Sequence, residues 1–193
     1  MSISLVAGLG NPGPEYARTR HNLGQMVVEA LARKHGLGWR REPAFDAEVA
    51  RWSRDSDPVR WLARPLTYMN ESGRAIGALA RYHHIPVEGI VAVYDDLTIE
   101  TGRLKVTVTG SAGGHNGAAS LLDHLGDGWI RYRLGIGPKH PQEMDLKDYV
   151  LSPFTPEQLT IIEQKLPIYV QGLELVLDRG ADQAMNQLNR KDP

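Results

Sequence analysis

Cysteine is absent from the 193 residues of this chain. A disulfide framework and a thiolate metal site are therefore both excluded. The chain also has no run of about 18 apolar residues of the kind that crosses a membrane. Its start, MSISLVAGLG, has neither the basic region nor the long apolar stretch of a signal peptide. From these absences we expect a soluble, cytoplasmic protein.

A strong net charge is lacking as well, since 22 Lys and Arg oppose 23 Asp and Glu to give −1. This balance argues against a general nucleic-acid binder, because contacts from Lys and Arg to phosphate dominate such affinity. The charges are nevertheless uneven: residues 1–140 carry a balance of +3 and residues 141–193 a balance of −4. An acidic tail thus masks a mildly basic body, where we expect a polyanion to bind with modest affinity.

Hydrophobic periodicity predicts alternating strands and helices. Apolar and β-rich runs predict strands at residues 3–9, 45–53, 58–64, 89–94, 103–108 and 131–137. Three- and four-residue spacing predicts helices at residues 22–35, 76–82 and 116–125, and in the tail from about residue 155. This alternation predicts one α/β domain over residues 1–193, a three-layer sandwich in which helices flank a twisted, mostly parallel mixed sheet.

Three local signals refine this prediction. Asn22 and Gln25 resemble a capping pair at the start of the first helix. Asp55 and Asp57 fit the turn of a hairpin between the second and third strands. Pro167 interrupts the apolar stripe of the tail and is expected to kink or split that helix.

The stretch GLGNPGPEY, residues 8–16, contains the G-x-G-x-x-G pattern of a dinucleotide-binding loop. Such a loop needs a helix that begins within the glycine run, so that its N–H groups face the pyrophosphate. Pro12 and Pro14 oppose this, because the residue before a proline is biased away from helical dihedrals. A nucleotide-dependent oxidoreductase is therefore disfavoured. The alternative is a rigid loop that holds Asn11 at the carboxyl edge of a strand, where open α/β sheets place their sites.

His21 and Asp95 are the candidates for acid–base chemistry. His21 stands just before a predicted helix, where a polar residue at a helix start is the simpler interpretation. Asp95 follows the apolar strand IVAVY, and a turn aspartate is its simpler interpretation, which Asp96 fits better. A carboxylate that accepts from one imidazole nitrogen fixes the tautomer and raises the basicity of the other nitrogen. Such a pair would let His21 take a proton from water.

Asparagines stand at three loop-to-helix junctions: Asn11, Asn70 and Asn116. Position alone allows Asn70 and Asn116 to be helix caps. Neutral amide groups gathered around one carbonyl are, however, what an oxyanion site uses when no metal is present. We therefore keep both interpretations for these side chains.

Metal and ATP are not expected. The loop GSAGGHNG, residues 110–117, lacks the G-K-[ST] ending of a Walker loop. His83 and His84 are adjacent on a predicted helix and point about 100° apart, and His35, His124 and His140 lack partners at ligand spacing. These five histidines are interpreted as surface or core residues.

Basic residues occupy the strands that flank this loop: Lys105, Arg131 and Arg133. An exposed strand face is the common place for such charges. Lys105 and Arg133 are alternatively suited to clamp a phosphate.

Six motifs follow one another along the chain: GLGNPGPEYARTRHNLG, PLTYMNESGRA, YDDL, GSAGGHNG, RYRLGIG and DYVLSPF. Together and in this order they resemble the bacterial-type peptidyl-tRNA hydrolase family, from residue 5 to about residue 154. The resemblance implies a monomeric α/β hydrolase without cofactor or metal. Its substrate would be peptidyl-tRNA, and cleavage of the ester between the peptide and the 3′ ribose would recycle tRNA from aborted translation.

The resemblance also implies roles for individual residues. The family's catalytic histidine and its partner aspartate fall on His21 and Asp95, and its site asparagines fall on Asn11, Asn70 and Asn116. Residues of substrate binding and of the tRNA-phosphate clamp fall on Tyr16, Tyr68, Met69, His115, Lys105 and Arg133. The sequence departs from the family pattern at residues 98–100 and 118–120, which puts RNA backbone contacts in doubt and leaves the chemistry untouched.

The main alternative is a non-catalytic RNA-binding relative, since organellar splicing cofactors that resemble the hydrolase also use this fold. Such a protein has no need of the histidine. This chain keeps His21, Asp95 and the three asparagines, and its body is only mildly basic. The sequence therefore favours the enzyme.

Overall fold

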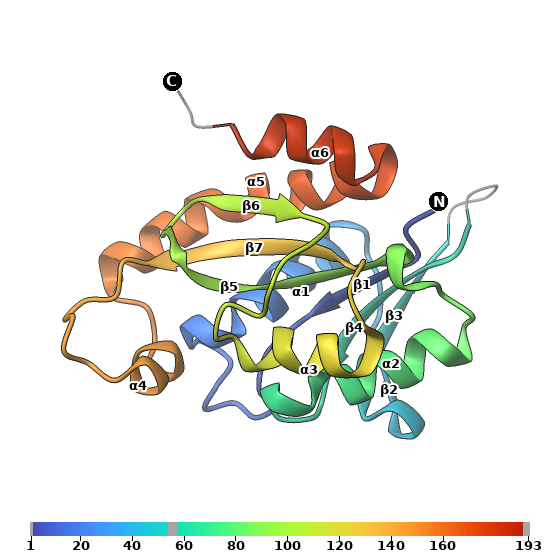
Figure 1. Ribbon diagram of the computed structural model, residues 1–193, viewed down its shortest axis with the longest axis horizontal. Helices are drawn as coiled ribbons and strands as arrows, with labels where there is room; N and C mark the ends of the chain where they lie inside the picture. The colour runs from blue at the N-terminus through green and yellow to red at the C-terminus, as the bar shows by residue number, and fades with distance from the viewer. Residues whose placement is uncertain (1, 54–57, 191–193) are drawn as a thin grey trace.

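A seven-stranded sheet runs through the middle of the computed structural model, which describes residues 2–53 and 58–190 (Figure 1). The strands are β1 (Leu5–Gly8), β2 (Arg40–Glu42), β3 (Ala47–Trp52), β4 (Arg60–Pro65), β5 (Ile90–Glu100), β6 (Leu104–Thr107) and β7 (Ile130–Gly137). The helices are α1 (Leu23–Lys34), α2 (Ser72–Tyr82), α3 (Asn116–Leu125), α4 (Leu146–Leu151), α5 (Pro156–Arg179) and α6 (Ala181–Leu188). Short 3-10 turns are η1 (Arg20–Asn22), η2 (Pro43–Phe45), η3 (Met69–Glu71) and η4 (Val87–Gly89).

The strand order is β2-β3-β4-β1-β5-β7-β6. The four central strands β4, β1, β5 and β7 are parallel to one another, whereas β3 and β6 each run antiparallel to their neighbours. The prediction of a mostly parallel mixed sheet is therefore confirmed. Because the central strands are parallel, their carboxyl ends meet at one edge, which is where such sheets place ligands.

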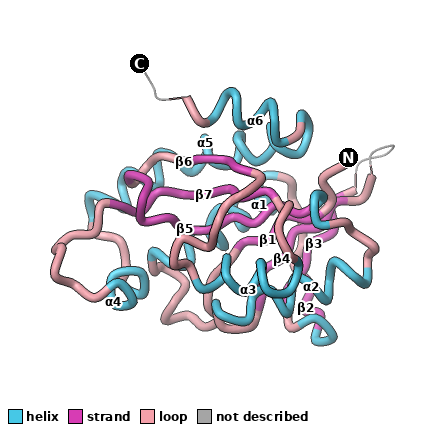
Figure 2. Tube along the Cα trace, viewed as in Figure 1, coloured by secondary structure: helices cyan, strands magenta, loops and turns pink. Residues whose placement is uncertain are grey.

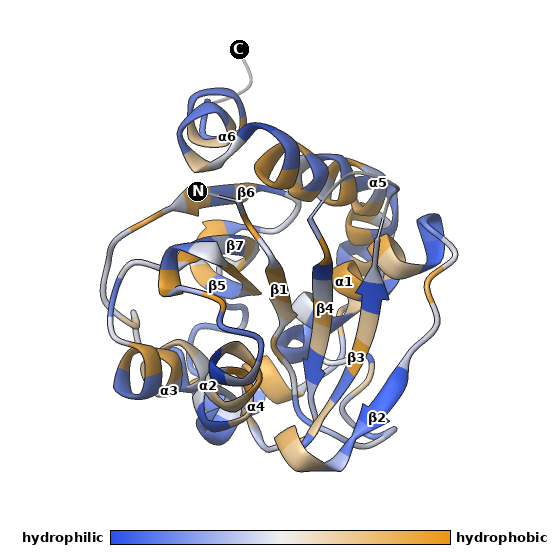
Figure 3. Ribbon diagram, turned by 90° about the vertical axis from the view of Figure 1, so that its right-hand side faces the viewer, coloured by the Kyte–Doolittle hydropathy of each residue, from blue (hydrophilic) through white to orange (hydrophobic). Residues whose placement is uncertain are grey.

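Helices cover both faces of the sheet, as the sequence predicted. Val6 of β1 packs in a cluster with residues of α1 and α5, whereas its neighbours Leu5 and Ala7 pack with residues of α2 and α3. This split follows from the pleat, since successive side chains of a strand point to opposite faces. Strand β1 is hydrophobic along its length, and the edge strand β2 is hydrophilic (Figure 3). The result is a three-layer sandwich with a core on each side.

Two parts of the sheet, the end of β5 and the strand β2, differ from the prediction. Strand β5 continues to Glu100, so Asp95 lies inside the strand and not after it. The pairing of β5 with β7 becomes irregular between Asp96 and Glu100, just past the point where the apolar run ends. Strand β2 was not predicted because its residues, RRE, carry no apolar signal. The predicted hairpin is present as the antiparallel pair β3–β4, and its turn residues Asp55 and Asp57 lie outside the described residues.

Pro167 was predicted to kink or split the tail helix, and the split does not occur. Helix α5 is continuous over 24 residues with Pro167 inside it, and the chain breaks instead at Gly180, where φ is +81°. Buried side chains on both sides of the proline, Ile162 and Tyr169 among them, hold the helix against the sheet. Packing of this kind outweighs the one main-chain hydrogen bond that proline removes. No helix in the described ranges has both the length and the hydrophobicity to cross a membrane.

The tail also covers one open edge of the sheet. Helix α6 packs on the edge strand β6, and Asn189 follows it. The Asn189 side chain accepts from the main-chain N of Val106 at 2.7 Å and donates to the main-chain O of the same residue at 2.8 Å. A single amide thereby satisfies both polar groups that β6 would otherwise leave unpaired there.

Gly24 lies where helix α1 approaches strand β5 most closely. A Cβ atom at this position would lie 2.1 Å from the carbonyl O of Val93, which is far inside van der Waals contact. The glycine in TRHNLG therefore lets the start of α1 sit directly over the strand that carries Asp95. The turn η1, which precedes α1, is fixed in this way beside that carboxylate.

Candidate active site

A cleft of about 760 Å³ opens at the carboxyl edge of the central strands. Loops (pink) surround this edge, and α4 lies beyond the sheet on the same side (Figure 2). The cleft brings together nine of the residues predicted from the sequence: Asn11, Tyr16, His21, Tyr68, Met69, Asn70, Asp95, His115 and Asn116. Lys105 and Arg133 are not among its lining residues.

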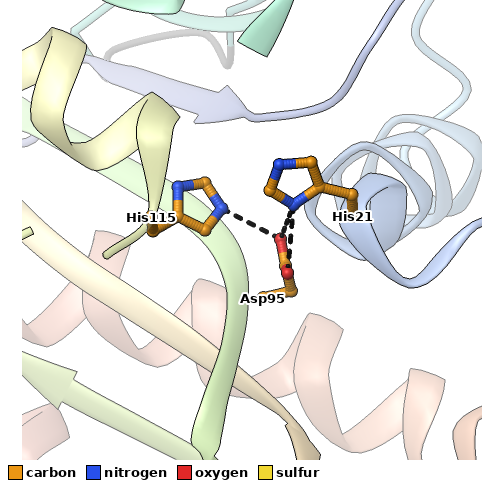
Figure 4. A group of neighbouring side chains, drawn as sticks. All are labelled: His21, Asp95 and His115. Carbon is orange, nitrogen blue, oxygen red and sulfur yellow. Dashed lines mark hydrogen bonds and ion pairs between the residues drawn. The ribbon is translucent and has the colours of Figure 1, made fainter. Parts of the chain in front are cut away.

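His21 and Asp95 form a buried pair at the base of the cleft (Figure 4). The Nδ1 atom of His21 lies 3.0 and 3.1 Å from the two carboxylate oxygens of Asp95, and the two residues are 7% and 2% exposed. Because the ionised carboxylate can only accept, the hydrogen bond places the proton on Nδ1. The Nε2 atom has no hydrogen-bond partner within the described ranges and is the ring nitrogen left for a ligand in the cleft.

His115 contacts the same carboxylate from the opposite side, at the start of α3 (Figure 4). Its Nε2 atom lies 2.9 Å from Oδ1 of Asp95, and its Nδ1 atom accepts from the main-chain N–H groups of Gly117 and Ala118, each at 3.1 Å. Nδ1 therefore carries no proton, so Nε2–H donates to Asp95. Both ring nitrogens are used inside the protein, which leaves neither for the predicted contact with substrate.

The electrostatics of Asp95 follow from this geometry. Burial raises the pKa of its carboxyl group, but the imidazoles of His115 and His21 lower it by more, so the pKa lies well below its usual range. A carboxylate with a depressed pKa stabilises the fold above its unfolded value of about 3.9, and this stabilisation is lost as the pH falls towards the folded value. Asp95 is thus ionised at neutral pH and remains an acceptor for both rings.

Tyr94 completes the wall behind His115. Its ring lies 4.8 Å from the His115 ring, and burial raises the pKa of its hydroxyl to about 12. Tyr94 is therefore neutral at the pH at which an imidazole titrates, and it contributes an apolar surface to the site.

Asn11 is held in place by Asn22. The Asn22 side chain accepts from the main-chain N of Asn11 and donates to its main-chain O, both at 2.9 Å. The Asn11 Oδ1 atom accepts from the main-chain N of Met69 at 2.8 Å, so its Nδ2 donors are left for the cleft. Asn22 occupies the N-cap position of α1, as predicted, but its side chain makes no cap hydrogen bond and binds the main chain of Asn11 instead.

Asn70 and Asn116 are exposed at the cleft, and neither caps a helix. The N-cap position of α2 is Glu71, and the cap of α3 is the ring of His115. The two amide side chains make no hydrogen bond within the described part of the chain. Both are thus available to a ligand, as the oxyanion interpretation requires.

Two tyrosines and a methionine shape the mouth of the cleft. The rings of Tyr16 and Tyr68 meet edge to face with centroids 6.4 Å apart, and Tyr68 is 58% exposed. Met69 is buried beneath them at 4% exposure. Tyr68 is therefore suited to contact a ligand directly, whereas Met69 forms the floor.

The predicted clamp residues lie outside the cleft but close to one another. Lys105 and Arg133 are directly opposed in the antiparallel β6–β7 pair. Arg133 donates to Asp96 at 3.1 Å, and Asp96 lines the cleft. Asp96 also accepts from the main-chain N of Thr98 at 2.7 Å. It lies inside β5, where the pairing with β7 becomes irregular, so the structure places it in the strand and not in a turn after it. The remaining strand arginine, Arg131, is 1% exposed and is not available to a phosphate.

Sequence reasoning missed one wall of the cleft, formed by Asp145, Leu146, Lys147, Val150 and Leu151. These residues belong to α4 and the residue before it. The motif DYVLSPF pointed to this region, but a six-residue helix gives no periodicity from which a site can be predicted. The sequence also gave no signal for Arg20, whose side chain reaches α4 from the His21 turn.

Potential metal ligands do approach one another in the described residues, contrary to the expectation from spacing: single atoms of His21, Asp95 and His115 lie within 4.8 Å of each other. A metal would have to bind Nε2 of His115, which carries the ring proton because Nδ1 already accepts two N–H groups. Removing that proton would leave an imidazolate. The donor set therefore suits a hydrogen-bonded triad better than a metal ion.

Comparisons with known proteins indicate the same family over nearly the whole length of the chain. The family model described as peptidyl-tRNA hydrolase matches residues 5–193. Peptidyl-tRNA hydrolases from Symbiobacterium thermophilum and Chloroflexus aggregans are each 43% identical to this chain, over 188 and 187 residues respectively. Each alignment covers 96% of this chain and 98% of the relative. The crystal structure of peptidyl-tRNA hydrolase from Acinetobacter baumannii is similar with a TM-score of 0.90 at 34% identity, covering 99% of this chain and 96% of that one.

Proposed function

The chain belongs to the peptidyl-tRNA hydrolase family and is a hydrolase of peptidyl-tRNA, and from this premise we propose that His21 is its general base. Asp95 orients the ring through Nδ1 and leaves Nε2 free to take a proton from water. The observation that carries this proposal is the buried contact between His21 and Asp95 at the base of the cleft. The distances of 3.0 and 3.1 Å lie within the usual range of an N–H···O hydrogen bond.

The reaction proceeds in two steps. His21 takes a proton from water, and the resulting hydroxide adds to the carbonyl carbon of the ester between the peptide and the 3′ ribose. The tetrahedral oxyanion then collapses, the bond to the ribose oxygen breaks, and His21 returns its proton to that oxygen. Asn70 donates to the oxyanion, and Asn11 and Asn116 hold the water and the peptide main chain. A metal has no part in these steps, because amide donors stabilise the developing charge.

His115 serves this mechanism as a positioning residue. It approaches Asp95 from the side opposite His21 and shares Oδ1 with it. Because its own ring is fixed by the N-terminus of α3, it fixes the carboxylate in turn. This role replaces the substrate contact predicted from the sequence.

We also propose that the protein acts as a monomer in the cytoplasm, where its substrate arises. Residues of one chain supply every wall of the cleft, which supports a monomeric site. The splicing-cofactor alternative is less favoured, because the compared relatives are hydrolases. A protein that only binds RNA would also gain nothing from a buried carboxylate between two imidazoles.

The mechanism is tested by the pH dependence of the wild-type protein on N-acetylaminoacyl-tRNA in the presence of a chelator. Since the base acts in its neutral form, we expect kcat/KM to rise with pH through the range in which imidazoles titrate and then to level off. Chelator is expected to leave the rate unchanged. A pH-independent rate across that range, or loss of activity that added Zn²⁺ or Mg²⁺ restores, would contradict the mechanism.

For the clamp, we propose that Lys105 and Arg133 bind tRNA phosphate from outside the cleft, which makes affinity dependent on salt. Lys105→Ala is expected to weaken tRNA binding and to reduce the slope of log K against log salt by about one. Lys165→Ala on α5 is the matched control and should leave the slope unchanged. An unaltered slope in Lys105→Ala, measured by fluorescence titration with deacylated tRNA, would remove Lys105 from the clamp.

A further inference from the structure

Arg20 is a buried cation that the proposed mechanism does not use. It stands next to His21 in η1 and is 3% exposed. The two side chains diverge: His21 contacts Asp95 in the cleft, whereas the Arg20 guanidinium contacts α4 and the start of α5. A charge placed so deeply beside the general base calls for a physical reason.

The hydrogen-bond partners of Arg20 are all neutral. Nη1 donates to the main-chain O atoms of Tyr149 and Ser152, at 3.1 and 3.3 Å, and to the Ser152 hydroxyl. Nη2 donates to the Gln158 side chain at 2.7 Å, and the guanidinium lies 4.1 Å from the centre of the Tyr149 ring. Within the described residues no carboxylate pairs with it, and its buried Nε has no hydrogen-bond partner. Burial of such a charge is costly, so stability alone does not account for it.

The hydrogen-bond acceptors of Arg20 show which segments its guanidinium holds together. The carbonyls of Tyr149 and Ser152 lie at the C-terminal end of α4, where the partial negative charge of the helix end favours a cation. Gln158 belongs to the capping box of α5, and the Tyr149 hydroxyl donates to the main-chain O of Ile136 in β7 at 2.6 Å. Arg20 thus connects the His21 turn directly to α4 and α5, and through Tyr149 to β7.

Helix α4 depends on this junction for its position. It lies beyond the sheet (Figure 1), and its main packing partner is the turn η1. Its residues Leu146, Val150 and Leu151 form the cleft wall that sequence reasoning missed. The main-chain N of Arg20 also donates to the Ser152 O at 3.1 Å, so backbone and side chain act on the same end of the helix.

We propose that Arg20 is a positioning residue that sets the distance between the α4 wall and His21, and thereby determines how tightly the cleft holds the peptide part of its substrate. The proposal rests on the proposed function only in taking this cleft as the substrate site. It assigns Arg20 to binding, whereas His21 and Asp95 are assigned to chemistry.

The test compares Arg20→Met, Arg20→Lys and the exposed control Arg74→Met, using the full chain. In Arg20→Met we expect KM to rise by about ten- to a hundredfold while kcat stays within about threefold, with the pH profile unmoved. Lysine is expected not to rescue KM, since one ammonium cannot reach acceptors on both α4 and Gln158. Hydrogen exchange should become faster in residues 146–152 and stay unchanged in α1 and the central strands.

A second variant keeps the test open if Arg20→Met folds poorly. Gln158→Leu removes the acceptor of Nη2 alone, and it should raise KM in the same direction by about two- to fivefold. Unchanged KM despite faster exchange in residues 146–152 would overturn the proposal. Faster exchange throughout the chain, or a fall in kcat with a displaced pH profile, would also overturn it. The exchange measurement needs no catalysis, so it separates failure of this proposal from failure of the His21 mechanism.

Discussion

Replacing His21 by alanine is expected to reduce kcat for peptidyl-tRNA hydrolysis by about 10²- to 10⁴-fold, the usual contribution of a general base. The loss arises because no other side chain in the described cleft combines a free imidazole nitrogen with a carboxylate partner: both nitrogens of His115 are already bonded. Single-turnover release of N-acetylaminoacyl groups measures this directly. The residual rate should no longer depend on pH in the imidazole range.

The binding of tRNA provides the necessary contrast. His21 lies at the base of the cleft and does not touch the proposed phosphate clamp, so His21→Ala should bind deacylated tRNA as the wild type does. His124→Ala is a matched control, because His124 is an exposed histidine on α3 and alanine suits a helix. A variant His21→Ala that retains most of its activity would exclude His21 as the base.

Asp95→Asn is expected to lower kcat by a similar or larger factor, about 10³- to 10⁴-fold, with little change in tRNA binding. The carboxylate accepts N–H bonds from two imidazoles, at 2.9 and 3.0 Å. An amide oxygen in the place of Oδ1 can accept from both rings. The NH₂ group then takes the place of Oδ2, 3.1 Å from Nδ1 of His21, where it meets an N–H donor unless a ring changes its tautomer. If His21 is the ring that changes, its proton moves to Nε2 and the nitrogen facing the cleft is no longer a base.

This prediction is checked by measuring kcat of the variant together with its thermal midpoint of unfolding, which shows whether the variant is folded. Asp123→Asn, a change at an exposed aspartate of α3 that does not line the cleft, serves as the comparison and should retain most of the activity. ¹⁵N NMR of the imidazoles in Asp95→Asn should show an altered tautomer for His21 or a broken cap at α3. Near-normal kcat in a folded Asp95→Asn variant would contradict the assigned role of the carboxylate.

Much of the fold was accessible from sequence because its signals are local. The spacing of apolar residues predicted α3 at the residues observed, and the alternation of strands and helices predicted the three layers. Pro167 does not split α5, because the buried residues of this helix pack against strands that are far away in the sequence. The local sequence carries no sign of those partners. Strand β2 and helix α4 were missed because three and six residues carry no usable period.

The candidate site shows the same division. His21 and Asp95 were paired because an imidazole and a carboxylate form a base, and because the motifs resemble those of a known family. The pair is present although β5 continues past Asp95. The supporting residues were not predictable. The Arg20 side chain donates to the main-chain O of Tyr149, 129 positions later in the sequence. The Asn22 side chain binds the main chain of Asn11 and does not cap the helix that follows it. Nothing in the neighbourhood of either residue indicates such a partner.

The bond between Asn189 and Val106 has a consequence for how copies of this chain behave towards one another. An uncovered edge strand is a template on which a second molecule can add a strand, which is the first step of edge-to-edge aggregation. On β6 the amide of Asn189 occupies the very main-chain groups that such an addition would use. The opposite edge, β2, is only three residues long and consists of charged residues, which is a common way to protect an edge strand. The segment that ends in Asn189 therefore blocks the addition of a strand at the β6 edge of the sheet.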